Sequence, residues 1–450
     1  MESCTLLKKS NNIPLLAILT GAFLVPLNST MITIGLSTIM DAFQTNVANV
    51  SWIVTVYLII MIVAQPIAGK LGDMYGTRKL FLLGLLLFLV ASLVCVYAPN
   101  LLVLIIGRGI QALGGALITP NGTAIIRFIT PKSKLTKAFG VFGFAMSIGA
   151  ALGPLLGAFL IGAWGWQSTF WINIPFTVLS FLIAYKYLPN IEPKSHTRLD
   201  IQGSILLGTF LTVLVLIVTN EWYTNVWLWL IFFLSFVLFV YREKRYGHPI
   251  IDFSLFKDAS FTSANLSILL NNAIMYCTIL IMPMMLERDV GYSIGSIGLL
   301  LFVFSLAISI ASWLGGYVEG KIGKGRTVGI SFGLLILALG LYVILPTIDT
   351  LVFAGLILFL GGIGSGLGVP SMQAASLEYV AKELTGVASG IYSMFRYFGS
   401  IAASVIISLQ IHYSVTMYIL IAFSILGLIV SKGMFIRVKK EEKNANTHIS

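Results

Sequence analysis

The segment from Gly69 to Lys79 gathers the side chains of this sequence that are best suited to ion chemistry. Between two long apolar runs it holds one carboxylate, Asp73, three basic residues and several glycines. A carboxylate can carry a proton, pair with a base or bind the start of a helix, where it contributes about 0.3–1 kcal/mol. Glycines let helix ends turn tightly and lie close together. Because Asp73 comes just before the second run, we predict a short loop that joins two helices and caps the second.

Two bases, Arg108 and Arg396, lie inside apolar runs, and no Asp or Glu lies deep in any run. A charged side chain inside a bilayer costs about 2.5–3.5 kcal/mol on insertion scales. Each arginine must therefore face the protein interior and have partners. The alternative to a functional Arg108 is a structural one that bonds backbone carbonyls and Gln111.

The elements that position these groups are predicted to be membrane helices. The chain has 450 residues, 58% of them hydrophobic and 10% charged, whereas about one quarter of a soluble domain is charged. Fourteen apolar runs are long enough to span a bilayer. They lie near residues 13–35, 48–68, 79–98, 101–126, 138–161, 168–188, 202–219, 225–241, 262–285, 296–318, 327–345, 350–374, 386–410 and 413–435.

The basic residues set the orientation of these spans. Of 28 Lys and Arg, all except Arg108, Arg288 and Arg396 fall in loops or tails on one side, which identifies that side as cytoplasmic. Both termini are then cytoplasmic, as an even number of spans requires. The net charge of +11 is therefore a feature of topology and does not indicate nucleic-acid binding.

The sequence lacks the residues that other functional classes require. The sequence has no phosphate-binding G-x-x-x-x-G-K-[S/T] loop for a pump, and its four His and peripheral acids form no catalytic cluster. Three scattered cysteines indicate neither a disulfide framework nor a metal site. We expect no enzyme activity, no cofactor and no metal.

The chain also repeats itself. Gly114–Pro120 aligns with Gly364–Pro370, and Ala138, Gly140 and Gly149 align with Ala388, Gly390 and Gly399. Such repeats are typical of transporters that bind substrate between two similar halves. We predict a six-helix bundle at 1–190, two inserted helices at 191–260, a second six-helix bundle at 261–436 and a basic cytoplasmic tail at 437–450.

Several motifs, in order along nearly the whole chain, resemble those of the major facilitator superfamily and its fourteen-span drug–proton antiporters. They are Gly69–Lys79, Arg108–Ala116, Gly149–Ala158, Trp166–Pro175, Pro249–Phe256 and Ala388–Gly399. The resemblance implies an all-α major facilitator fold of fourteen spans.

The resemblance also implies roles for particular residues. Gly69, Asp73, Gly76 and Arg78 would form a cytoplasmic gate that bridges to the facing bundle, with Glu319 and Arg326 as a weaker counterpart in the second half. Arg108 would act in proton movement or cavity electrostatics, and Arg396 would face the cavity. The helix motif of exporters would be Gly149, Gly153, Pro154 and Gly157, whose glycines form one smooth face. A plain helix cap and ordinary helix packing are the alternatives.

One position departs from the family pattern. Asn28 replaces the span-one Asp that serves relatives as the embedded proton and cation site, and an amide cannot titrate. Protons could be coupled through a peripheral carboxylate, coupling could be absent, or Asn28 could be an engineered neutralisation. With two buried arginines and no buried acid, neutral or anionic amphiphiles should fit better than dications.

The substrate cavity is predicted from polar and adaptable residues within core spans. These are Asn28, Tyr57, Gln111, Asn121, Asn271, Asn272, Met275 and Phe395, for any of which interhelical bonding or packing is the alternative. The sequence thus predicts a multi-pass transporter of a bacterial cell membrane that exports amphiphilic compounds, with protons as coupling ion and a monomer as the working unit. The alternative function is a carrier for a single physiological metabolite or lipid-like substrate, with or without coupling to protons.

Overall fold

The computed structural model describes residues 13–191, 199–219, 224–247, 249–347, 350–409 and 411–434. The predicted basic tail at 437–450 lies outside these ranges. Fourteen helices in the described part are long and apolar enough to cross a membrane, so the predicted span count is confirmed.

The first half of the chain contributes the helices of one bundle. They are α1 (Ile13–Ile34), α2 (Leu36–Ala42), α3 (Val47–Val50), α4 (Trp52–Tyr75), α5 (Thr77–Val96), α6 (Leu101–Ile129), η3 (Lys132–Lys134), α7 (Leu135–Trp164), α8 (Ser168–Trp171) and α9 (Asn173–Tyr187). Two helices without counterparts follow, α10 (Ile201–Thr219) and α11 (Val226–Arg245).

The second half contributes the helices of the other bundle. They are η5 (Phe253–Lys257), α12 (Ala259–Arg288), α13 (Ile294–Ile322), α14 (Lys324–Ile344), η6 (Leu345–Thr347), α15 (Leu351–Leu367), α16 (Val369–Glu378), η7 (Lys382–Leu384), α17 (Thr385–Ser408) and α18 (Tyr413–Ser431).

Polar residues between the apolar runs fix where several helices begin. The Asn100 side chain accepts from the Val103 amide at the start of α6, at 3.0 Å. Asp258 accepts from the Ser260 and Phe261 amides at the start of α12. The first amides of a helix have no partner within it, so such side chains stabilise the end by about 1 kcal/mol.

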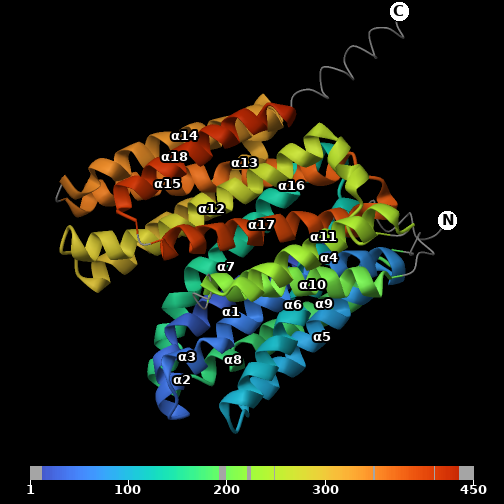
Figure 1. The fold of residues 1–450 in the computed structure, drawn as a ribbon, viewed down its shortest axis with the longest axis horizontal. Helices are drawn as coiled ribbons and strands as arrows, with labels where there is room; N and C mark the ends of the chain where they lie inside the picture. Colours follow the sequence, from blue (N-terminus) through green and yellow to red (C-terminus); the bar gives the residue numbers. More distant parts are fainter. Residues whose placement is uncertain are drawn as a thin grey trace, which may run out of the picture.

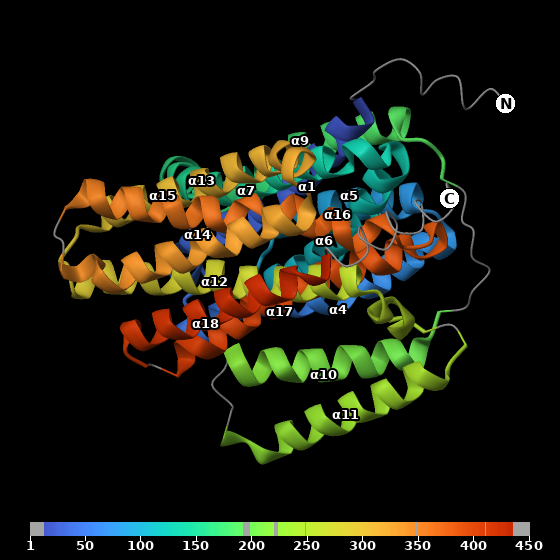
Figure 2. The ribbon, with the colours of Figure 1, turned by 90° about the horizontal axis from the view of Figure 1, so that it is seen from above.

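The two six-helix bundles lie side by side, and the extra pair lies outside them. In Figure 1 the bundles meet near the inner ends of α4 and α17 and diverge toward the opposite end. Figure 2 shows α10 and α11 as a separate layer along one side of the bundles. Of this pair, α10 packs against α4 and α17, one helix from each bundle.

The segment at 69–79 is not the predicted loop. Helix α4 continues to Tyr75 and α5 begins at Thr77, so Gly76 alone joins them, with φ of +100°. A residue with a side chain rarely adopts that conformation, which explains the glycine. Gly323 joins α13 to α14 in the same way, with φ of +84°. Asp73 therefore lies in the last turn of α4 and does not cap α5.

Glycines bring the bundles into backbone contact at the inner side. A Cβ on Gly69 would collide with the Gly386 carbonyl of α17. In the same way, a Cβ on Gly390 would lie 2.6 Å from the Gln65 carbonyl. The related pair α7 and α13 shows the same arrangement, because a Cβ on Gly316 would lie 2.9 Å from Lys137 Cα. These close approaches hold the cytoplasmic side closed.

We predict that Gly69→Val destabilises this closed arrangement. The added side chain meets the backbone of α17, and overpacking of this kind costs about 1–3 kcal/mol. The melting temperature of the purified protein should fall by about 2 °C or more. Gly320→Val is the matched control, because a Cβ there has no neighbour within 4 Å. An equal loss in both variants would contradict the proposed contact.

Candidate functional site

The Asp73 carboxylate binds the start of a helix in the opposite bundle. Its Oδ1 accepts from the Gly386 amide at 2.8 Å and its Oδ2 from the Val387 amide at 2.9 Å. These are free amides of the first turn of α17, whose N-cap residue, Leu384, makes no side-chain cap. A buried carboxylate is thus neutralised by two donors and by the positive end of the helix dipole. The contact can exist only while α4 and α17 touch.

A second bridge between the bundles uses the other end of a helix. Arg127, at the end of α6, donates from Nε to the Leu377 carbonyl at 3.1 Å and from Nη2 to the Glu378 carbonyl at 3.0 Å. These carbonyls end α16, where a cation is favoured. Both bridges lie on the inner side, so that side is closed by complementary charges at helix ends as well as by packing.

The other charged residues of the predicted gate do not share the contact that Asp73 makes. Arg78 donates from Nη2 to the Tyr185 carbonyl at 2.5 Å, which ties α5 to α9 within one bundle. Glu319 lies 3.8 Å from Lys324, which also pairs with Glu378. Arg326 is exposed.

The register of the repeat explains the difference at Glu319. Gly316 takes the place of Gly69, and Gly323 that of Gly76, so Gly320 stands where Asp73 does. Glu319 is one residue out of phase, which turns it by about 100° around the helix. The carboxylate cap of the first half therefore has no equivalent on the described α13.

A buried polar network lies inside the first bundle. Asn28 on α1 donates from Nδ2 to Gln111 Oε1 on α6, at 3.0 Å, and accepts from Asn173 Nδ2 on α9, at 2.9 Å. Gln111 Oε1 also accepts from Arg108 Nη1 at 2.7 Å, and Gln111 Nε2 donates to Ser92 Oγ at 2.9 Å. The network joins four helices at the position of the missing acid.

The groups at the two ends of this network, Arg108 and Ser92, determine the direction of each hydrogen bond. Arg108 has only donors, so the Gln111 atom that faces it must be oxygen. The Ser92 hydroxyl donates to the Phe88 carbonyl, so it accepts from Gln111. The Asn28 atom that faces Gln111 Oε1 must then be the amide nitrogen. An ionised Asp at position 28 would place oxygen against oxygen unless Gln111 turned, so the neutral Asn28 fits its surroundings.

Hydrogen-bond acceptors and an aromatic ring stabilise the Arg108 charge. Its guanidinium lies 4.3 Å from the centre of the Tyr57 ring, and Nε lies 3.5 Å from the Ile53 carbonyl. The side chain is fully buried, and Nη2 has no hydrogen-bond partner among the described residues. A buried cation without a carboxylate is costly, so the interior of this bundle carries net positive charge.

Most of the predicted cavity residues are buried in contacts within one bundle. Asn121 donates to the Ala68 carbonyl of α4, and Asn271 donates to the Ser365 carbonyl of α15. Asn28, Tyr57, Gln111 and Asn272 are also buried. Met275 and Phe395 alone among the eight are partly exposed. The cavity role of the others remains a prediction.

The glycine face of α7 packs on α1. A Cβ on Gly149 would lie 2.6 Å from the Phe23 carbonyl, and one on Gly157 would lie 3.0 Å from the Met31 carbonyl. A Cβ on Gly153 would collide with the Thr30 hydroxyl. Pro154 faces outward from this contact and is exposed. The motif therefore brings α1 and α7 together within the first bundle.

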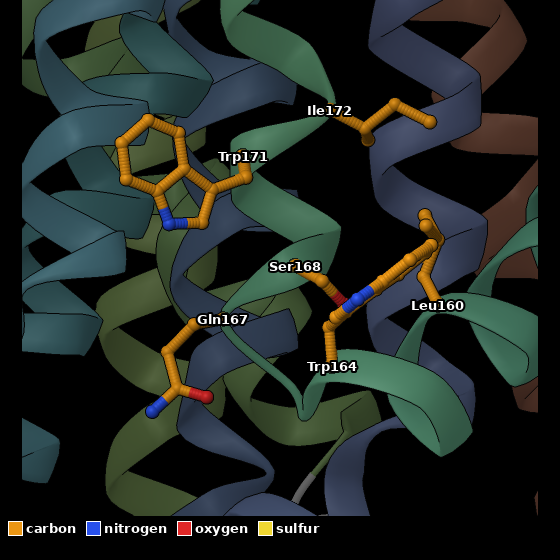
Figure 3. Close-up of a pocket in the computed structure, with 6 residues that line it drawn as sticks. All are labelled: Leu160, Trp164, Gln167, Ser168, Trp171 and Ile172. Carbon is orange, nitrogen blue, oxygen red and sulfur yellow. The ribbon is translucent and has the colours of Figure 1, made fainter.

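An open hollow lies at the outer ends of α7 and α8. It measures about 730 Å³ and is lined by Leu160, Trp164, Gln167, Ser168, Trp171 and Ile172 (Figure 3). Trp164 and Trp171 are exposed, and Trp is enriched at membrane–water interfaces. This hollow therefore fits an interfacial position better than a central substrate site.

The same motifs and helix arrangement occur in a known family. A model described as Major Facilitator Superfamily matches residues 18–264 and 264–449. The chain belongs to the major facilitator superfamily. It is thus a multi-pass membrane transporter and not an enzyme, and its relatives indicate a bacterial cell membrane.

Individual relatives of this superfamily transporter agree with that assignment. It is 46% identical to the uncharacterized MFS-type transporter YvkA of Bacillus subtilis, over 93% of this chain and 95% of the relative. It is 31% identical to the multidrug resistance protein Stp of Mycobacterium tuberculosis, over 88% of this chain and 74% of Stp. The structure of the human organic anion transporter MFSD10 superposes with a TM-score of 0.70 at 15% identity, covering 94% of this chain and all of that one.

Some residues of the site were not predicted from the sequence. Asn173 was part of a recognised motif, but its contact with Asn28 joins positions far apart in the chain. Arg127 carried a usable signal, because a base at the end of a span can bind helix carbonyls. Nothing in the sequence indicated that those carbonyls belong to the opposite half of this transporter.

We predict that Asp73→Asn loosens the inner contact and leaves the protein folded. An amide keeps one acceptor and loses the charge, and hydrogen bonds to charged groups contribute about 1.5–3 kcal/mol. The test places a cysteine at buried Ser389 in a cysteine-free background. This cysteine should react with maleimide about tenfold faster in Asp73→Asn than in the chain that keeps Asp73. A cysteine in place of Ser424, buried in α18, is the control and should keep its rate. Unchanged labelling at position 389 would refute the gate.

Proposed function

We propose that this transporter exports amphiphilic compounds by alternating access, and that the structure corresponds to the state with a closed inner side. The observation that carries the proposal is the bond between Asp73 and the start of α17. It links helices of opposite bundles at one membrane face, and both partners return to water when the bundles separate. The likeness to a multidrug resistance protein and the glycine motif of α7 support export rather than uptake.

The charges within the membrane favour neutral or anionic substrates. Arg396 is partly buried on α17, with Nη1 3.5 Å from the Met146 sulfur of α7 across the bundle interface. Arg108 adds a second cation without an ion pair among the described groups. A dication between the bundles would lose its water, and the Asp73 carboxylate at their contact is already bound by two amides of α17, so burying the dication is costly.

The partly exposed Met275 and Phe395 suit adaptable binding. Methionine is flexible and polarisable, and it contacts irregular apolar surfaces well. Phe395 lies 5.9 Å from the Phe256 ring and 6.2 Å from the Phe398 ring, so an apolar body can pack on this aromatic group. A substrate with an apolar body and a neutral or negative head fits both features.

We predict efflux of an anionic dye and little efflux of a dication. The chain would be reconstituted in proteoliposomes loaded with anilinonaphthalene sulfonate or, separately, with propidium. Release of the anion should exceed that of the dication, and Asp73→Asn should reduce it strongly because the gate closes less readily. Faster release of propidium would overturn the assignment of substrate charge. Movement of neither dye would favour a carrier of one metabolite.

We predict that Asn28→Asp makes this efflux depend more strongly on a pH gradient. A protonated carboxyl at position 28 can donate to Gln111 Oε1, whereas an ionised one places oxygen against that oxygen, so its proton changes the network. Dye release would be compared with and without an imposed gradient, and Asn28→Leu serves as the untitratable control. Equal responses of the two variants would place proton coupling elsewhere.

A further inference from the structure

Two buried carboxylates face each other at the inner ends of the inserted helices. Asp200 lies just before α10 and Glu243 in the last turns of α11, and their side chains are almost fully buried. A Cβ on Gly203 would lie 2.7 Å from both Asp200 Oδ2 and Glu243 Oε1. Both oxygens therefore border the space that the missing side chain of Gly203 leaves open.

The two carboxylates differ in the hydrogen bonds that they accept. Asp200 accepts from Arg242 Nε at 2.8 Å and from the Gly203 amide at 2.9 Å, and Arg242 Nη2 lies 2.8 Å from Oδ1. These donors suit an ionised Asp200. Glu243 Oε2 accepts from the Ile251 amide at 2.9 Å, whereas Oε1 has no partner among the described residues.

We propose that Asp200 and Glu243 form a proton-binding site, in which Glu243 Oε1 carries the proton and donates it to Asp200 Oδ2. Two ionised carboxylates so close would repel each other, and one shared proton removes the repulsion. The proton also gives the unpaired oxygen a partner, as buried polar atoms normally have. The Ile250 amide also interacts with this carboxyl, but no described group makes a hydrogen bond to Oε1.

The charged groups around the site connect it to the gate. Apart from Asp200 and Arg242, the charge among the described residues that acts on Glu243 is Lys70, buried on α4. Lys70 in turn interacts with Asp73 and with Asp252, which precedes η5. Lys70 lies one helical turn before Asp73. Loss of the proton leaves an anion that attracts Lys70, so the proton state of Glu243 acts on the helix that closes the inner side. This last step rests on the proposed transport function, whereas the proton site itself does not.

Infrared spectroscopy of the purified chain tests the site without transport. As the pH is raised, the band of protonated carboxylic acids should lose a component that is missing in Glu243→Gln. Glu378→Gln is the matched control, because Glu378 is paired with Lys324 outside the proposed site, and this variant should keep the component. A titrating component of equal size in Glu243→Gln and the unmodified chain would overturn the proposal.

A second variant keeps the test decisive if Glu243→Gln does not fold. Lys70→Gln removes a cation that favours the ionised form, so the component should titrate at a pH higher by about one unit. An unchanged midpoint in Lys70→Gln would refute the link to α4. Dye efflux without a pH gradient is measured in parallel. Absence of efflux by the unmodified chain, with an intact proton component, would disprove the proposed transport function and leave the proton site standing.

Discussion

The closed inner side depends on one carboxylate that caps a helix it is not part of. The first amides of any helix need acceptors, and α17 takes them from Asp73 on α4 rather than from its own preceding residues. The cap is therefore complete only when the bundles touch. Gly69 and Gly386 make this possible, because any side chain between them would hold Asp73 away from the amides. Charge, helix dipole and backbone shape thus support one contact.

The gate is asymmetric although the fold repeats itself. On the α4–α17 side, packing by glycines is combined with the charged cap. On the α7–α13 side, Gly140 and Gly316 allow the same close approach, but Gly320 replaces the carboxylate. Lys324 instead gathers Glu319 and Glu378 within the second half. Opening therefore breaks the carboxylate cap on one side, and glycine packing with the contact of Lys137 on the Tyr317 ring on the other. The first side is thus the one that a proton on a carboxylate can control.

The sequence predicted the properties that depend on composition and spacing, and not those that depend on which helices meet. Fourteen spans follow from apolar length, and the close contacts at Gly69 and Gly149 follow from small residues. The prediction of a loop at 69–79 was wrong, because the polar residues of a helix end resemble those of a loop. The partner of Asp73 and the burial of Asn121 and Asn271 are set by tertiary contacts between distant segments, which a single sequence does not encode locally.

The replacement of the embedded acid moves the chemistry of this transporter toward its inner face. Asn28 and Gln111 complete a network whose directions are fixed by Arg108, and none of the described residues that form it is a carboxylate. The buried carboxylates that remain among the described residues, Asp73, Asp200 and Glu243, lie at the inner ends of α4, α10 and α11. Lys70 lies between these sites on the helix that carries Asp73. A proton bound there does not need to cross half the bilayer to reach the gate, because both sites act on the same turn of α4.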